Sequence, residues 1–443
     1  MNTVESYQEL YRQLAEDLPG HDVSWVRSMR KASLQRFSAM GLPTRKQEEW
    51  KYTPLNTRGK NLFLPLSSPS TSIEIDKWRS LPLISLDAYR LVFVDGYLSQ
   101  YLTDLDALPP GLVVNSLSEL FSKDVKNEEL HTIFDNGKNT DDWLKALNKT
   151  FLTDGAVITV QAGAQFDKPL HLQFINTTPN STASYICNAL VLQANSHVHL
   201  LESHVAVGEV NYHNNLQTFI HLDENAQLEH YKLQLDGLAT IHLANTEVEQ
   251  GRDSQYRNYL FALGSSLMRN EIRIALNASG AECFLNGFFL AQNEQHLDIH
   301  TRIDHHAAQC TSRETYRGIA RDRGKGIFDG LVMVHPDAQH SDARVTTNNL
   351  LLSPTAEIDA KPQLEIYADD VKCSHGATIG QLDENVLFYL RSRGIDETVA
   401  HNMLLVAFAN QSVELCLQPD IKQKVHELLL HYLSGGEKNY RSL

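Results

Sequence analysis

The segment Cys373-Ser374-His375-Gly376 carries the most specific candidate chemistry in the sequence. If residues 364–375 form one strand, Cys373 and His375 share a face about 7 Å apart, because successive residues rise roughly 3.3 Å and alternate in direction. A thiolate and an imidazole that project together suit iron, zinc or an iron–sulfur cluster. Two ligands cannot close such a site, so others must come from elsewhere in the chain or from another chain. The alternative is that Cys373 is a small buried residue and His375 a solvated turn residue.

A second group of histidines and acids lies upstream. The pattern permits metal binding but does not require it, because histidines on a surface or between neighbouring repeats are more common than metal ligands. Elsewhere, residues 321–326 lack the GxxxxGK[ST] spacing of a phosphate-binding loop, and no Gly-x-Ser-x-Gly occurs, so neither chemistry is indicated. The members of the group are His296, His300, Asp304, His305, His306, His335 and His340.

The middle of the chain, from about residue 155 to 370, predicts an all-β unit of short alternating runs separated by Asn, Gly, Asp and Pro. A small residue followed by Ala and then Gln or Glu opens several runs, mostly at spacings of about 30 residues or twice that. Such repeats favour a β-solenoid, in which one rung buries its inner face only against its neighbours. A Greek-key sandwich is the alternative. The triplets begin at Gly163, Asn225, Gly280, Ala307, Asp337 and Thr355.

Helical patterns precede this unit. Apolar residues at 3.6-residue spacing predict helices over residues 4–14 and 24–40, the second capped by Ser24 and stopped at Gly41. Residues from about 56 to 150 are mixed. They contain a predicted strand that enters the Asp95-Gly96 turn and a short helix over 141–147. The first predicted domain, residues 1–150, is therefore helical and mixed α/β, and it precedes a β core over residues 151–376.

Helical patterns also follow the β core and predict a third domain over residues 377–443. Asp383 and Asp396 are placed to cap two helices, and the Pro419-Asp420 pair opens a third, with Gln423 placed to reciprocate the cap. The second helix is expected to turn Val399, Met403, Val406 and Phe408 inward. The last helix carries an apolar stripe that ends before Gly435-Gly436, and the tail after it should fray.

Composition restricts the function. The chain has 443 residues, 42% hydrophobic and 21% charged, which is typical of a soluble protein of two or three domains. Its 39 basic and 54 acidic residues give a net charge of −15, which argues against nucleic acid and anionic membranes as partners. Its five cysteines form no CxxC pair, and its first residues lack the basic and apolar regions of a secretory signal. A reducing cytoplasm is the expected compartment.

A polysaccharide-active enzyme built on a β-solenoid is the alternative function. Lyases of that shape use clustered carboxylates to hold calcium and an arginine as base. They are secreted, so the lack of a signal sequence argues against this class. The residues that could serve are Asp298, Asp304, Asp322 and Asp329, with Arg302 or Arg317.

The run from Asn348 to Ile395 closely resembles the SufB/SufD family of iron–sulfur cluster assembly proteins. Residues 311–318 and 326–330 are also similar to that family. Near the N-terminus, Gly41–Arg45 followed by Glu48–Thr53 resembles the SufD branch of the family. Two further features agree with that branch, since Asn348-Asn349-Leu350 replaces a Cys-Asp pair of the SufB branch and no N-terminal CxxCxxxC is present.

The resemblance implies a right-handed parallel β-helix (β-solenoid) core flanked by helical domains, and a scaffold without turnover of its own. It implies that the core pairs with a SufB-like paralogue, while a homodimer of the chain alone stays open. His375 would contribute to a nascent iron–sulfur cluster at the interface between the two proteins, with Cys373 beside it. The cluster would be transient, and no permanently bound cofactor is expected.

The C-terminal helices resemble the segment on which the family docks its ABC-type ATPase, SufC. The consecutive apolar residues there support this role, because some of them must face away from the local core. The alternative is that they wedge between the helices and the last rung of the β core. The predicted docking residues are Leu387, Phe388, Tyr389, Leu390, Arg391, Arg393, Met403 and Phe408.

Overall fold

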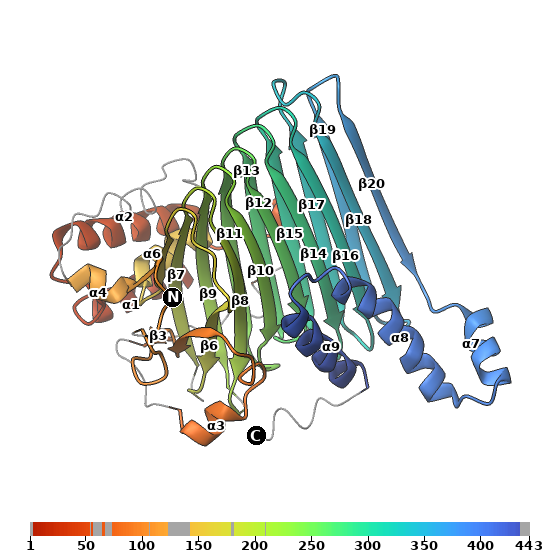
Figure 1. Cartoon of the computed structure of the whole chain (residues 1–443). Coiled ribbons are helices and arrows are strands. Elements are labelled where there is room, and N and C mark those ends of the chain that lie inside the picture. Colours follow the sequence, from red (N-terminus) through yellow and green to blue (C-terminus); the bar gives the residue numbers. More distant parts are fainter. Residues whose placement is uncertain are drawn as a thin grey trace.

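The computed structural model describes residues 3–53, 55, 64–66, 73–105, 107–122, 142–178, 181–208 and 210–434. In this part of the chain, two ten-stranded sheets face each other and the chain passes from one to the other at each turn, which confirms the predicted β-solenoid (Figure 1). From β5 to β20 odd-numbered strands form sheet A and even-numbered strands form sheet B, and all neighbours in these two series pair in parallel.

From β7 onward the strands of the solenoid have similar lengths, and β5 and β6 are shorter. Sheet A contains β5 (Ala156–Val160), β7 (Thr182–Leu192), β9 (Tyr212–Leu222), β11 (Ile241–Gln250), β13 (Leu267–Leu276), β15 (His296–His305), β17 (Lys325–Val334) and β19 (Glu357–Ile366). Sheet B contains β6 (Leu170–Asn176), β8 (His197–Ala206), β10 (Gln227–Leu235), β12 (Gln255–Ala262), β14 (Glu282–Ala291), β16 (Thr311–Ala320), β18 (Asp342–Leu351) and β20 (Lys372–Gly380).

Short strands from the N-terminal part close the first end of the solenoid. β2 (Tyr89–Val94) pairs with β6 and turns through Asp95-Gly96 into β3 (Tyr97–Leu98), as the sequence predicts. β4 (Leu112–Ser116) pairs antiparallel with β5, and β1 (Leu64–Pro65) pairs with β7. These strands lie before residue 151, and β20 extends to Gly380, so the domain limits at 150 and 376 stay predictions.

The corners before the sheet B strands form a stack in the left-handed region of the backbone. Gly163, Asn225 and Gly280, which open predicted repeats, have φ of 72°, 58° and 76°. Asn and Gly tolerate this conformation best, which explains their recurrence. In the later rungs the equivalent residues are Gln309 and His340, so the triplets at Ala307 and Asp337 begin slightly too early.

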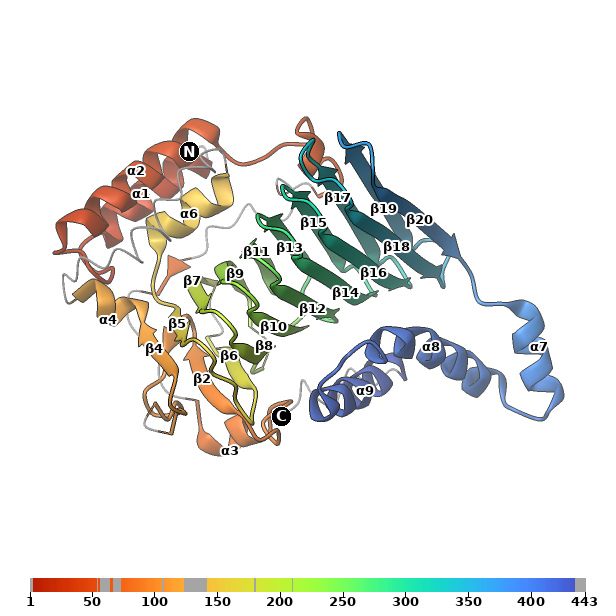
Figure 2. The same ribbon diagram turned by 45° about the horizontal axis from the view of Figure 1, so that its top comes forward.

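N-terminal helices cover the outer face of sheet A at the closed end (Figure 2). Tyr7, Phe37 and Phe151 pack with Tyr185 of β7 in one apolar cluster. Val23, rather than the predicted Ser24, occupies the cap position of the second helix, which ends before Gly41. Asp142 caps the helix expected over 141–147, and Asp141 itself lies outside the described residues. The elements are α1 (Thr3–Leu14), α2 (Ser24–Met40), a 3-10 turn (Glu48–Trp50), α3 (Ile75–Arg79), α4 (Leu117–Ser122) and α6 (Trp143–Phe151).

Residues 48–53, here called the N-terminal strap, cross from α2 to the outer face of β13 and β15. Arg269 donates to the Glu49 carbonyl at 2.8 Å, and its guanidinium lies 4.0 Å from the Trp50 ring centre. Asp298 accepts from Arg269 at 2.7 Å and from the Thr53 hydroxyl at 2.5 Å. Burial raises the pKa of Asp298, but His300 and Arg269 outweigh it and hold the pKa well below its ordinary value.

The last two C-terminal helices pack on the outer face of sheet B, whereas the helix before them lies away from the sheets (Figure 2). Asp383 caps α7 (Glu384–Ser392) and Asp396 caps α8 (Glu397–Val413), as predicted. The cap of α9 (Pro419–Leu433) is Gln418, whereas Gln423 bonds to Glu427, because Pro419 fits the first helical position and leaves the cap to the residue before it. The tail after Gly435 lies outside the described residues.

No helix in the described ranges is long and apolar enough to cross a membrane.

Buried histidines predict how stability depends on pH. Burial lowers the pKa of His171 to about 3, and the pKa values of His213, His242 and His305 to about 4, from an ordinary value of 6.5. Below pH 6.5 the unfolded chain takes up protons that the folded chain refuses. The free energy of unfolding should therefore fall as pH drops from 6.5 towards 4, by about 1.4 kcal/mol per pH unit for each histidine.

Urea unfolding at several values between pH 7.5 and 5.5 measures this slope. His305→Gln should reduce this slope by the contribution of one histidine. The glutamine amide can still contact Ser312, whose hydroxyl lies 2.8 Å from His305 Nε2 in the wild type. His401→Gln on α8 is the control. A slope that is the same in wild type and His305→Gln would contradict the assignment.

The strap gives a second stability prediction. Asp298→Asn removes the nearest counter-charge of the buried Arg269 and leaves it only the longer pair with Glu271 at 3.6 Å. Breaking a buried pair in this way costs about 3–5 kcal/mol. Asp370→Asn is the matched control, because Asp370 pairs with His340 on the surface and exposed pairs contribute about 1 kcal/mol or less. Chemical denaturation measures both, and an Asp298→Asn variant as stable as the control would show that the strap is not anchored here.

Candidate functional site

Cys373 and His375 lie on β20, the last strand of sheet B, at the open end of the solenoid (Figure 1). The premise that residues 364–375 form one strand is wrong, because β19 ends at Ile366 in sheet A and β20 begins at Lys372 in sheet B. The chain must change sheet at every rung, and it does so here through residues 367–371. Cys373 and His375 still share one face, because both belong to β20.

That face continues the interior of the solenoid. Cys373 is in register with Ala343, and His375 with Val345, and both partners are buried in the core. In the described chain no further strand follows β20 in sheet B, so positions that are buried in the earlier rungs reach the surface here. Cys373 remains half-buried against the core, whereas His375 is exposed. The open end thus forms a mouth in which two potential metal ligands stand side by side on one strand.

A single hydrogen bond fixes the orientation of His375. Its Nδ1 lies 2.9 Å from the carbonyl oxygen of Pro362 on β19. A carbonyl oxygen only accepts, so Nδ1 must carry the proton, and the lone pair is left on Nε2. Metal-binding histidines commonly have their second nitrogen held in this way. The bond therefore prepares His375 as a ligand through Nε2.

The Cys373 thiol is less ready than His375 to bind a metal. Burial raises its pKa, and the neighbouring charge of Asp342 acts in the same direction, while a backbone hydrogen bond from Ala343 lowers it. The thiol is therefore protonated at neutral pH and becomes a ligand only if a metal displaces the proton. Within the described ranges, neither Cys373 nor His375 belongs to a group of three potential ligands. The open end thus offers two potential ligands, which are too few for a closed metal site.

The upstream histidines separate into different environments. His296 contacts the Thr53 hydroxyl of the strap at 2.9 Å, and His300 pairs with Asp298 at 2.8 Å. His305 points to Ser312, and His340 pairs with Asp370 at an exposed corner. Only Asp304, His306 and His335 come together with metal-ligand spacing. Two hydrogen bonds from Arg302, at 2.8 and 3.0 Å, already occupy the Asp304 carboxylate, so a cation would have to displace an arginine.

The carboxylates of the alternative enzyme do not converge on one site. Asp298 is buried under the strap, Asp304 is held by Arg302, and Asp329 pairs with Lys361 at 3.6 Å. Asp322 lies at an exposed corner. Arg317 belongs to sheet B, where it stacks on Phe408 of α8, so it cannot serve carboxylates on the outer face of sheet A. This arrangement does not support a calcium-dependent lyase.

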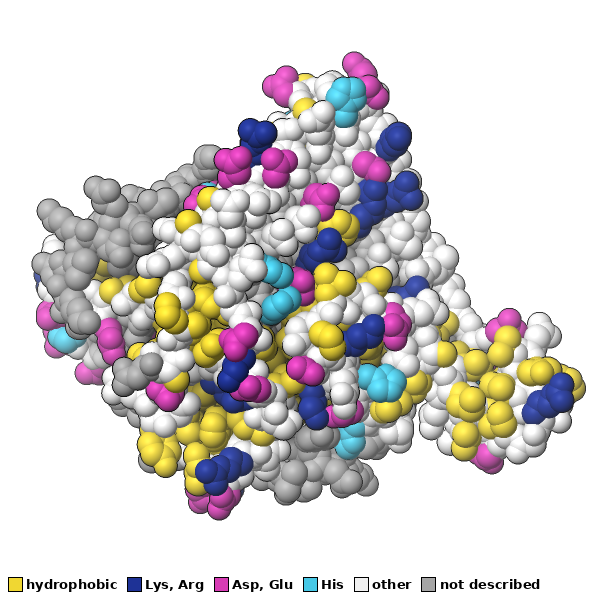
Figure 3. Space-filling view, in the orientation of Figure 1, with side chains coloured by type: hydrophobic (Ala, Val, Ile, Leu, Met, Phe, Trp, Pro, Cys, Tyr) yellow, Lys and Arg dark blue, Asp and Glu magenta, His cyan; other side chains and the backbone are white. Residues whose placement is uncertain are grey.

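The C-terminal helices expose an apolar surface on the part farthest from the solenoid (Figure 3). Of the predicted docking residues, Phe388, Tyr389 and Met403 belong to it, with Phe388 74% exposed. Leu387 is buried and Leu390 half-buried, Phe408 packs against the solenoid, Arg391 pairs with Glu397, and Arg393 stacks on Tyr389. The α7–α8 surface is formed by Val386, Phe388, Tyr389, Val399 and Met403.

The predicted docking residues did not include two members of this surface, Val386 and Val399, and the sequence did not indicate the partner of His375. Val399 and Met403 were expected to point inward but are exposed, because α8 is apolar nearly all round and its pattern does not mark one face. Val386 lies in α7, which packs little against the rest. The Pro362 carbonyl carries no signal in the sequence, since a backbone acceptor is defined only by the fold.

Of the five cysteines, all are free and four are buried.

Comparison with known proteins agrees with the fold and the motifs. Residues 174–408 match a family model described as the SufBD core domain of the SUF system for FeS cluster assembly. Residues 1–172 match a model of the N-terminal region of SufBD proteins.

Curated relatives cover most of the chain. It is 32% identical over 414 residues to the iron–sulfur cluster assembly protein SufD of Escherichia coli. The matched region covers 91% of this chain and 92% of that protein. It is 29% identical over 405 residues to an iron–sulfur cluster assembly SufBD family protein of Synechocystis, with 89% and 88% covered. The chloroplastic protein ABCI7 of Arabidopsis thaliana is 29% identical over 400 residues, with 88% and 82% covered.

Proposed function

The chain belongs to the SufB/SufD family of iron–sulfur cluster assembly proteins, and from this premise we propose that it is a scaffold subunit without turnover of its own. Its role is to present His375 at the open mouth of the solenoid to a nascent iron–sulfur cluster, which is the cargo of the complex. The compartment we infer is the cytoplasm.

This proposal rests on the hydrogen bond that holds His375 and leaves the lone pair on its Nε2. Nδ1 is engaged by the Pro362 carbonyl at 2.9 Å, and the His375 side chain is exposed on the last strand of the solenoid. An imidazole bound in this way suits iron as well as zinc. Because only one thiol stands beside it, the remaining ligands must come from another chain. Incomplete ligation also suits a cluster that has to be transferred, since a closed site would retain it.

The unpaired strand edges support a partner at the same place. Along the described chain, β19 pairs only with β17 and β20 only with β18, so both present free backbone donors and acceptors. Exposed edges of this length are rarely left open in a finished assembly. We infer that a SufB-like paralogue covers this end and supplies thiolate to the iron that His375 binds. A second copy of this chain is the alternative cover when the paralogue is absent.

The α7–α8 surface supports a second partner. Five apolar side chains, each at least 41% exposed, lie on α7, which projects from the solenoid, and on the first two turns of α8 (Figure 3). Exposed apolar clusters of this kind mark protein interfaces. We infer that a SufC-like ABC ATPase docks here. Nucleotide hydrolysis would then move the docked helices and shift the population of arrangements at the mouth.

The role of His375 is tested by substitution. In cells that depend on this chain, His375→Ala should leave the complex with its SufB-like partner intact and reduce cluster formation at least tenfold, because the iron loses its only prepared imidazole. Copurification measures assembly, and the activity of an iron–sulfur reporter enzyme measures yield. Ser374→Ala is the matched control, since Ser374 points away from Cys373 and His375 on the same strand. Normal yield in His375→Ala would refute the proposal.

The docking surface is tested by cross-linking. A photoreactive residue at position 388 or 389 should cross-link the ATPase, and the same residue at Val113, an exposed apolar position on β4, should not. Phe388→Glu should weaken the complex more than about 30-fold, as expected for loss of an apolar anchor worth 2 kcal/mol or more. Equal labelling at both places, or no labelling on α7 and α8, would exclude docking there.

A further inference from the structure

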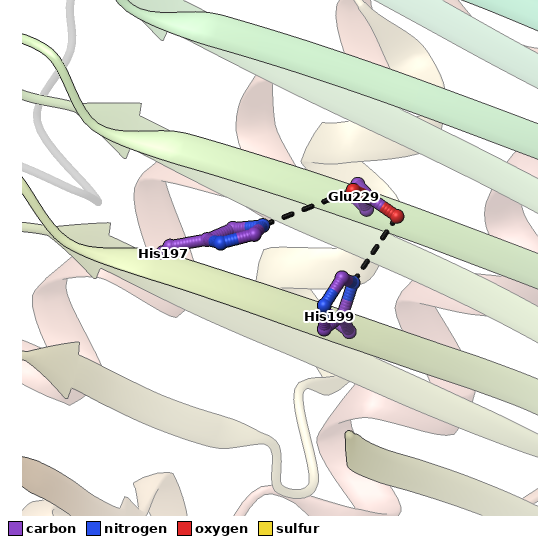
Figure 4. Close-up of side chains that lie close together, drawn as sticks. All are labelled: His197, His199 and Glu229. Carbon is purple, nitrogen blue, oxygen red and sulfur yellow. Dashed lines mark hydrogen bonds and ion pairs between the residues drawn. The ribbon is translucent and has the colours of Figure 1, made fainter. Parts of the chain in front are cut away.

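A second group of potential ligands lies on the outer face of sheet B, away from the mouth. His197 and His199 are two residues apart on β8, so they share a face, and Glu229 stands directly opposite His199 on β10 (Figure 4). His199 Nδ1 lies 3.1 Å from one carboxylate oxygen and His197 Nε2 lies 3.8 Å from the other. The three ligand atoms lie within 4.8 Å of one another. Neighbouring strands thus converge on one point with two nitrogens and one carboxylate.

The carboxylate is held in place from behind. The Tyr231 hydroxyl donates to Glu229 at 2.6 Å and accepts from the backbone nitrogen of Gln418 at 3.0 Å, at the start of α9. A ligand fixed by packing and by a neighbouring hydroxyl is the arrangement that metal sites use.

The group is open to solvent and has no competing cation. Glu229 is 8% exposed, while the two histidine side chains are 31% and 26% exposed, so an ion can reach them from one side. Within the described ranges, Glu229 makes no ion pair with Lys or Arg. Arg257, which is opposite Glu229 on β12, stacks on Phe284 at 4.0 Å instead. This distinguishes the group from Asp304, His306 and His335, where Arg302 occupies the carboxylate.

We propose that His197, His199 and Glu229 bind one divalent first-row transition-metal ion, with water at the remaining positions. Two imidazoles and one carboxylate suit Fe²⁺, Co²⁺, Ni²⁺ and Zn²⁺, whereas Mg²⁺ and Ca²⁺ prefer oxygen ligands alone. Bonds of about 2.0–2.2 Å place two ligand atoms of one ion at most about 4.4 Å apart, so small side-chain rotations suffice to bring together three atoms that lie within 4.8 Å. Five strand spacings of about 4.8 Å separate β10 from β20, roughly 24 Å, so this site is independent of His375 and of the proposed function.

Metal titration of the full-length chain without an affinity tag tests the proposal. After removal of bound metal with a chelator, Zn²⁺ and Co²⁺ are titrated calorimetrically, and X-ray absorption at the zinc edge reports the ligands. We expect one high-affinity ion per chain with two imidazoles, oxygen and no sulfur. His197→Gln and His199→Gln should each weaken binding more than about tenfold. Both histidines are partly exposed, so these variants should fold, and thermal unfolding without metal verifies it.

Two variants locate the ion. His335→Gln removes a ligand of the Asp304 group, and His375→Ala removes the imidazole at the mouth; both should bind as wild type does. Loss of the ion in either of these, unchanged affinity in His197→Gln and His199→Gln, sulfur in the absorption spectrum, or a Kd weaker than about 1 mM would each overturn the assignment. If cluster assembly is normal but the chain binds no metal at this site, this proposal is refuted and the proposed role of His375 is unaffected.

Discussion

The structure depends on backbone pairing between successive rungs. A rung satisfies its hydrogen-bonding groups and buries its inner side chains only when another rung lies on each side. At the first end, the short strands β2, β3 and β4 provide that pairing. At the other end nothing in the described chain does so, and β19 and β20 are left with one neighbour each. The same architecture that stabilises the core therefore produces one closed end and one open end.

At the open end, positions that belong to the buried core in earlier rungs carry potential metal ligands. Ala343 and Val345 fill the positions that precede Cys373 and His375, and both are fully buried. One rung later the same positions carry a thiol and an imidazole at the surface. The opposing strand β19 adds the Pro362 carbonyl that holds the imidazole. Thus the two sheets, and not a local loop, build the geometry of the site.

Much of the fold followed from the sequence, because solenoid repeats leave a strong local signal. Asn and Gly at left-handed corners and the period-two alternation identified the β core, and Asp383 and Asp396 identified two helix caps. What the sequence could not supply are contacts between distant segments. The strap reaches Asp298 from residue 53, and Glu229 meets His199 across 30 residues. The histidines could not be sorted by spacing either, because the partner of each one is set by register and by the segments packed outside the sheets.

The position of α7 connects the two ends of the proposed mechanism. Only residues 381–383 separate β20 from α7, so the strand that carries His375 continues almost directly into the helix that exposes Phe388 and Tyr389. α8 and α9, by contrast, pack on sheet B, and Tyr231 joins the start of α9 to β10. A partner bound to α7 therefore acts on a helix with little packing of its own and on an edge strand with one neighbour. In the proposed mechanism, motion applied there passes to β20 through three residues, while α8 and α9 stay packed on sheet B.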